Sequence, residues 1–245
     1  MHSGIYRFAD IDVEIVSLFE TVHRMCADYA TDSKPTIRIV TTAPDIAEEA
    51  VVSVKSNQRN GLPSTRFPDD YLETLAVYRK LATALLNNNV LLFHGSAVAV
   101  DGWAYLFTAK SGTGKSTHTA LWRKMLGGRA LMVNDDKPLI RITPEGKAVV
   151  YGTPWDGKHH LSKNSAFPLK AICWLTRAKE NTVEEIAPAE ICETLVSQTF
   201  RPQAPQSVVK MLDLVNRLSN AVRLYKMGCN TQLEAAELAY KTMNR

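Results

Sequence analysis

The sequence predicts an α/β protein with a mixed, partly antiparallel sheet and a small additional N-terminal α+β region. The first indication is a glycine-rich segment at 109–117, which lies between a strand-like run at 104–108 and a helix-like run at 118–126. The second is Asp101-Gly102, which separates two strand-like runs and is typical of a β-hairpin. This hairpin gives the strand before the glycine-rich segment an antiparallel neighbour, so the sheet cannot be wholly parallel.

Residues 1–88 are expected to form the small N-terminal α+β region. Its expected strands are 5–9, 13–16, 34–41 and 51–54. A helix is predicted over 68–87, because leucines recur there at helical spacing and Pro68, Asp69 and Asp70 suit a first turn. No catalytic group of residues is evident in this region.

Residues 89–245 are expected to form a second, larger domain that carries the chemistry. Its predicted strands are 90–100, 103–108, 129–133, 139–142, 148–151, 169–176 and 222–227. Its predicted helices are 118–126, 189–200, 206–220 and a last one that Thr231 caps and that ends at Met243. The strands at 139–142 and 148–151 are expected to pair as a second hairpin.

The glycine-rich segment has the layout of a phosphate-binding loop, in which a strand leads through glycines and Lys-Ser into a helix. Glycines let the backbone turn tightly and aim its N–H groups at a phosphate, and the helix adds the positive end of its dipole. Lys115 can reach the terminal phosphates, and the Ser116 hydroxyl can ligate Mg²⁺. The predicted nucleotide-binding residues are Ser111, Gly112, Thr113, Gly114, Lys115, Ser116 and Thr117. The alternative is a chance glycine turn before a helix.

Two carboxylates, Asp135 and Asp136, follow the predicted strand 129–133. Carboxylates at the end of a strand that comes after a phosphate-binding loop suit magnesium binding and proton transfer. One would hold Mg²⁺ and the other would take a proton from an acceptor hydroxyl. The alternative is a surface turn, in which aspartate is common.

The acceptor side of the site is predicted less specifically. The segment 152–160 combines glycines, a proline, an aromatic ring, a cation and imidazoles, so it is interpreted either as a loop that grips an acceptor or as a surface loop with Trp155 in the core. The candidate substrate residues are Trp155, Lys158, His159, Arg177 and Arg201. For each arginine, simple solvation at the surface is the alternative.

The composition indicates an ordinary globular protein, with 45% hydrophobic and 22% charged residues. Its net charge of +4 suits an anionic ligand but is too small to indicate nucleic-acid or membrane partners. The four cysteines are far apart and form no CxxC pair, so we expect free thiols. Neither a leader sequence nor a long apolar run is evident, which favours a cytoplasmic location. Oligomerisation is left open.

The block from His94 to Asp136 resembles the catalytic domain of HPr kinase/phosphorylase, whose fold is shared with phosphoenolpyruvate carboxykinases. The matching features are the His94-Gly95 pair, the hairpin, SGTGKST at 111–117 and the aspartate pair. The resemblance implies a mixed sheet, ATP on the loop and Mg²⁺ near Ser116. It also implies Asp135 as the general base, Asp136 beside the metal and His94 near the transferred phosphate, with the opposite assignment of the aspartates open.

Two departures bear on the acceptor. Thr117 stands where this family carries an acidic residue, and its arginine- and glycine-rich loop after the aspartate pair is not found. We therefore expect a Mg-ATP-dependent kinase whose acceptor is a hydroxyl of a peptide, a protein or a small molecule, and not necessarily HPr. The alternatives are a carboxykinase-like ATP- or GTP-dependent decarboxylase and a nucleotide-binding regulator without transfer activity.

Overall fold

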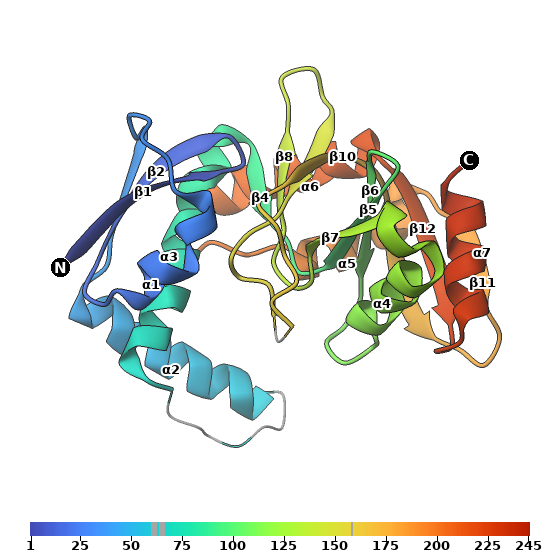
Figure 1. Cartoon of the computed structure of the whole chain (residues 1–245), viewed down its shortest axis with the longest axis horizontal. Helices are drawn as coiled ribbons and strands as arrows, with labels where there is room; N and C mark the ends of the chain where they lie inside the picture. The colour runs from blue at the N-terminus through green and yellow to red at the C-terminus, as the bar shows by residue number, and fades with distance from the viewer. Residues whose placement is uncertain (60–62, 64–66, 158) are drawn as a thin grey trace. The chain divides into compact units, whose positions relative to one another are not determined.

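The structure, a computed structural model, describes residues 1–59, 63, 67–157 and 159–245. The chain divides into two compact units, Met1–Ala84 and Leu85–Arg245, and Figure 1 follows them along the chain. Both units combine helices with a sheet, so the predicted α/β class is confirmed.

The N-terminal unit has a three-stranded sheet in the order β1-β2-β3. Strand β2 pairs antiparallel with β1 and parallel with β3. The strands are β1 (His2–Phe8), β2 (Ile11–Ser17) and β3 (Ile37–Val40), and the helices are α1 (Thr21–Met25), η1 (Ala27–Tyr29), α2 (Ala43–Arg59) and α3 (Asp69–Leu85). The predicted helix at 68–87 is therefore confirmed as α3.

The predicted strand at 51–54 is wrong, because these residues lie inside α2. Three valines in four residues favour a strand when they are considered alone. The preceding residues 47–50 are Ala-Glu-Glu-Ala, which are strong helix formers, and they continue the helix through the valines. The helix propensity of the longer stretch 47–54 therefore outweighs the strand preference of the valines.

The C-terminal unit contains a nine-stranded sheet. Its main path runs in the order β4-β8-β9-β10-β6-β5-β7, and β12 and β11 extend it from β10. The strands are β4 (Val90–Leu92), β5 (Ser96–Val100), β6 (Trp103–Thr108), β7 (Ala130–Asn134), β8 (Leu139–Ile142), β9 (Ala148–Tyr151), β10 (Ala166–Arg177), β11 (Thr182–Glu185) and β12 (Arg223–Cys229). Both predicted hairpins are present, since β5 pairs antiparallel with β6 and β8 with β9.

The mixed pairing brings several strand ends to one edge of this sheet. Strand β10 pairs parallel with both β6 and β12, so all three end at the same edge. Strand β7 pairs antiparallel with β5, which itself runs antiparallel to β6, so β7 also ends there and β5 begins there. Ligands of open α/β sheets bind beyond the carboxyl ends of such strands.

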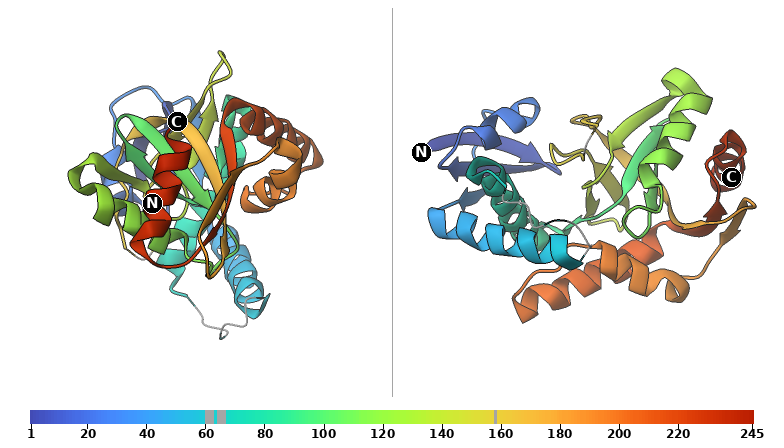
Figure 2. Two further views of the ribbon diagram at one scale, coloured as in Figure 1. Left: turned by 90° about the vertical axis from the view of Figure 1, so that its right-hand side faces the viewer. Right: turned by 90° about the horizontal axis from the view of Figure 1, so that it is seen from below.

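Helices cover both faces of the sheet, as the two views of Figure 2 show. One hydrophobic core lies under α4 and α7, and a second lies under α5 and α6. Strand β6 contributes side chains to both cores, because Phe107 packs in the core under α4 and α7 and Leu106 packs in the core under α5 and α6. The helices are α4 (Lys115–Leu126), α5 (Pro188–Gln198), α6 (Pro205–Ala221) and α7 (Leu233–Met243), with the short turns η2 (Leu86–Asn88) and η3 (Gly127–Arg129).

Two details of the C-terminal unit differ from the sequence-based expectation. Gln232, not Thr231, is the N-cap residue of α7, and it makes no capping hydrogen bond through its side chain. Strand β11 was not expected, because its sequence Thr-Val-Glu-Glu has one apolar residue. The strand pairs only with β12, at the edge of the sheet.

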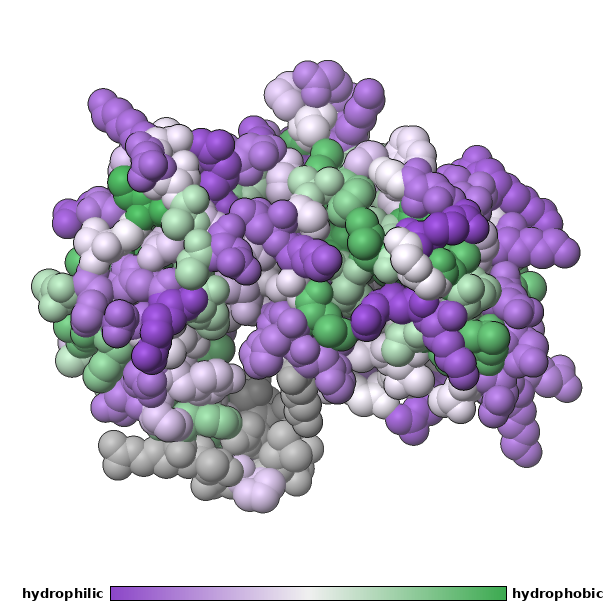
Figure 3. All heavy atoms as spheres, in the orientation of Figure 1, coloured by the Kyte–Doolittle hydropathy of each residue, from purple (hydrophilic) through white to green (hydrophobic). Residues whose placement is uncertain are grey.

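Polar side chains cover much of the face drawn in Figure 3. Among the described residues, no helix is both long and apolar enough to cross a bilayer.

Gly152 provides a test of the packing between β9 and the segment that follows it. A Cβ atom at this position would lie far inside contact distance of the Lys163 carbonyl oxygen and 2.8 Å from that of Val133. We expect Gly152→Ala to destabilise the protein by about 2 kcal/mol, as overpacking does. Gly128→Ala is the control, since a Cβ there meets nothing within 4 Å. Urea unfolding followed by circular dichroism measures both, and equal midpoints would contradict the packing.

Candidate functional site

The glycine-rich segment connects β6 to α4 as predicted. Gly112 and Gly114 have φ angles of +76° and +121°, a region that L side chains rarely adopt, so glycine is required at both turns. Among the described residues no side chain caps α4, and its first turn has no acidic residue. The first N–H groups of a helix lack intrahelical partners, so this helix start is suited to bind an anion.

Lys115 lies at the junction of loop and helix, and only 8% of it is exposed. Its Nζ donates a hydrogen bond of 3.2 Å to the carbonyl oxygen of Ala109, which begins the loop. Burial lowers the pKa of Lys115, and the positive charge of Lys137 adds to this, while the carboxylates of Asp136 and Asp135 oppose it. The lysine and both aspartates are therefore close enough to interact electrostatically.

The two aspartates have different surroundings. Asp135 is buried, with 7% exposed, and its Oδ1 accepts a hydrogen bond of 2.5 Å from Ser96 Oγ. The Asp136 side chain is 35% exposed. Its Oδ1 lies 3.5 Å from His94 Nε2 and 3.5 Å from Lys137 Nζ. The pair thus presents one carboxylate that is held by a hydroxyl and one that faces two nitrogen groups.

The buried amide of Asn134 fixes the backbone at this pair. Its Oδ1 accepts from the N–H groups of Asp136 at 2.9 Å and Lys137 at 2.6 Å. Its Nδ2 donates to the carbonyl and the hydroxyl of Thr153 and to the carbonyl of Trp155. One side chain therefore joins the end of β7 to the segment after β9.

His94 is held by the end of α5. The backbone N–H of His94 donates to the backbone carbonyl oxygen of Gln198 at 2.7 Å, and the imidazole Nδ1 lies 2.7 Å from Gln198 Oε1. Burial lowers the pKa of His94 to about 4, and the positive charges of Lys137 and Lys115 contribute, whereas Asp136 and Gln198 act in the opposite direction. The imidazole is therefore neutral at pH 7, and its Nε2 faces Asp136.

The candidate substrate residues are only partly brought together. Arg177, at the end of β10, donates to the carbonyl oxygens of Gly112 at 2.5 Å and Thr113 at 3.4 Å, so it contacts the loop. Trp155 is buried and follows Thr153 in the segment that Asn134 holds. His159 and Arg201 are exposed. Lys158 lies outside the described residues.

The C-terminal unit contains oxygen groups of the chemical kind that Mg²⁺ takes as ligands. Among the described residues, no group of three or more His, Cys, Asp or Glu side chains could hold a metal ion. Mg²⁺ does not require such a group, because it is usually held by one or two carboxylates together with substrate phosphates and water. The hydroxyl of Ser116 in the first turn of α4 and the carboxylate of Asp136 fit this type of site.

Several residues of the site were missed by the sequence interpretation. Ser96 and Gln198 contact Asp135 and His94 from 39 and 104 positions away in the chain, and no local pattern indicates such contacts. Lys137 and Asn134 flank the aspartate pair in the sequence. The order Asn-Asp-Asp-Lys could have indicated both, as an amide and a cation beside two carboxylates.

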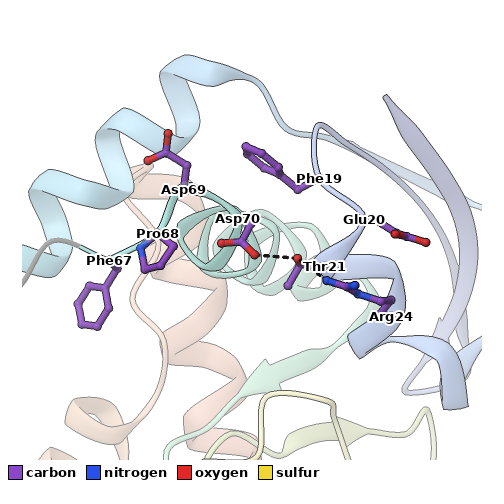
Figure 4. A pocket seen from close by; sticks show the side chains of 8 residues that line it. All are labelled: Phe19, Glu20, Thr21, Arg24, Phe67, Pro68, Asp69 and Asp70. Atoms are coloured by element: carbon purple, nitrogen blue, oxygen red, sulfur yellow. Dashed lines mark hydrogen bonds between the residues drawn. The ribbon is translucent and has the colours of Figure 1, made fainter.

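The N-terminal unit has a hollow of its own, lined by residues of α1 and α3 and of the segments just before each of these helices (Figure 4). Asp70 accepts a hydrogen bond of 2.9 Å from Thr21 Oγ1, and Arg24 donates to the same hydroxyl at 3.2 Å. These polar groups satisfy one another and connect the two helices. The contacts indicate a structural link, so the candidate site remains the edge of the larger sheet.

Comparisons with known proteins add little to this geometry. No protein-family model matches the chain, and no curated protein matches it. Among solved structures, the HPr(Ser) kinase/phosphatase from Coxiella burnetii matches 63% of this chain and 99% of its own, with 10% sequence identity and a TM-score of 0.31. This similarity is weak, and the assignment of the site rests on the contacts described above.

The environment of His94 predicts how it titrates. Its folded pKa of about 4 is below the unfolded value of about 6.5. The unfolded chain therefore binds more protons between these values, and the contribution of His94 to stability is lost as the pH falls from about 6.5 to about 4. NMR titration of the imidazole signals should give a midpoint near 4 for His94, assigned by its absence in His94→Gln. A midpoint near 6.5 would contradict the described burial.

Proposed function

We propose that this chain is a Mg-ATP-dependent phosphotransferase that moves the γ-phosphate to a hydroxyl group. The main support is the buried Lys115, which lies where a glycine-rich loop enters a helix and interacts with the charges of Asp135 and Asp136. A loop of backbone donors, a lysine and two carboxylates at one sheet edge are the groups that phosphoryl transfer requires.

The loop side of the site would bind and stabilise the phosphates. The N–H groups at the start of α4 and the Lys115 ammonium would balance the negative charge that develops on the transferred group. Arg177 already donates to two carbonyl oxygens of the loop, so it would set the position of the loop and add positive charge beside it. These interactions need no residue from outside the C-terminal unit.

The aspartates would divide the remaining tasks. We assign Mg²⁺ to Ser116 and Asp136, where the ion would orient the phosphates and neutralise their charge. Asp135 would accept the proton of the acceptor hydroxyl. The neutral His94 would add no positive charge that competes with the metal for Asp136, since its one proton lies on Nδ1 and is donated to Gln198 Oε1.

The acceptor would be a serine or threonine hydroxyl of a peptide or protein, or a hydroxyl of a small molecule. The site holds a base for a hydroxyl proton, and Asp136 shows that part of it is open to solvent. A panel of free L-serine, serine-containing peptides and water, each with Mg-ATP, covers these classes. ADP release and phosphate incorporation identify the acceptor.

The roles of Lys115 and Asp135 can be separated by substitution. We expect Lys115→Ala to weaken ATP binding and to reduce phosphate transfer by about 10²- to 10³-fold, because the phosphoryl charge loses its main cation. Asp135→Asn should reduce transfer by a similar factor but leave the ATP Kd within about threefold, because the proton acceptor is lost while the loop is kept. ADP release and calorimetry measure these two effects.

Lys124→Ala is the matched control, because Lys124 is an exposed lysine near the end of the same helix. It should leave both quantities unchanged. Loss of ATP affinity in Asp135→Asn would remove Asp135 from the role of base. Unchanged transfer in Lys115→Ala would remove the proposed function.

A further inference from the structure

Three buried groups form a continuous hydrogen-bonded chain next to the phosphate-binding loop. Thr119 Oγ1 lies 2.8 Å from Ser96 Oγ, and Ser96 Oγ lies 2.5 Å from Asp135 Oδ1. Ser96 is fully buried and Thr119 is 1% exposed. The chain thus connects α4, the start of β5 and the end of β7 without contact with solvent along its two hydroxyls.

Proton counting fixes the direction of this chain when Asp135 is ionised. A carboxylate can only accept, so the single proton of Ser96 must point to Asp135. The Ser96 oxygen is then free to accept, and the proton of Thr119 fills that position. The order of donation is therefore Thr119 to Ser96 to Asp135, and hydrogen bonds to an ionised group are the stronger kind.

Thr119 also has acceptors on its other side. Its Oγ1 lies 3.3 Å from the carbonyl oxygen of Lys115 and 3.2 Å from that of Ser116. Both carbonyls belong to the first turn of α4, so Thr119 connects the two hydroxyls to the helix start that carries Lys115 and Ser116.

We propose that Ser96 and Thr119 are positioning residues that hold the Asp135 carboxylate, through Ser96 Oγ, in the orientation in which it receives the acceptor proton. This inference rests on the proposed function, in which Asp135 is the base. In the step, the acceptor oxygen bonds to the γ-phosphorus and the bond from that phosphorus to the β,γ-bridging oxygen breaks. The electron pair leaves on ADP, and the acceptor proton moves to Asp135.

Asp136 does not share this arrangement. Its Oδ1 lies near His94 Nε2 and Lys137 Nζ, both of which are nitrogen groups, and not near a hydroxyl of the described chain. The Lys115 ammonium of α4 interacts with the charge of Asp135 as well as with that of Asp136. The two hydroxyls are therefore a feature that distinguishes the environment of Asp135 from that of Asp136.

Three substitutions test the chain. Thr119→Val keeps the shape of the side chain and removes its hydroxyl, Thr119→Ser keeps the hydroxyl, and Ser96→Ala removes the middle group. The assay is ADP release from Mg-ATP with the acceptor of the panel above that gives the wild type its highest rate, and calorimetry gives the ATP Kd. We expect Thr119→Val and Ser96→Ala to lower kcat by about tenfold or more, Thr119→Ser to stay within about threefold, and the ATP Kd to stay within about threefold in all.

Thr83→Val is the matched control, since Thr83 Oγ1 also donates to the carbonyl oxygen four residues earlier, that of Arg79, in a helix of the N-terminal unit. It should have the wild-type kcat. Equal kcat values for Thr119→Val and Thr119→Ser would overturn the inference while leaving the phosphotransferase function intact. A raised ATP Kd that accounts for the loss would also overturn it, by making Thr119 a nucleotide-binding residue. Absence of ADP release from the wild type with every acceptor would overturn the proposed function and the inference together.

Discussion

The hydrogen bonds of the Asn134 amide are the interaction on which the arrangement of the site depends. This side chain is fully buried, and both of its polar atoms have partners. An amide in such a position is costly to leave without partners, so the turn after β7 and the segment after β9 are fixed together. The orientation of the aspartate pair follows from that turn.

The directions of the strands account for the positions of the other site residues. Because β6, β7, β10 and β12 end at one edge and β5 begins there, the loop, the aspartates, Arg177 and His94 meet without any long connection crossing the sheet.

The two units of the chain also differ in their numbers of basic and acidic side chains. Residues 85–245 contain 20 basic and 13 acidic side chains, whereas residues 1–84 contain 9 and 12. The unit that holds the loop is thus the one suited to an anionic ligand.

The sequence was informative wherever the cause of a structure is local. The Asp101-Gly102 turn, the glycines of the loop and the hairpin of β8 and β9 follow from residues within a few positions of one another. The valines at 51–54 misled because their helical neighbours outweigh them. The contact of Ser96 with Asp135 and that of Gln198 with His94 join distant positions, so only the fold reveals them.

The hydrogen bond from Lys115 to the carbonyl oxygen of Ala109 has a consequence for the cost of binding a ligand. A lysine ammonium has three N–H donors, so this bond fixes the direction of the group at the start of the loop and leaves two donors free. Because the long side chain is already held in one place, a phosphate that binds as proposed would cost little of the rotamer entropy that a mobile lysine loses.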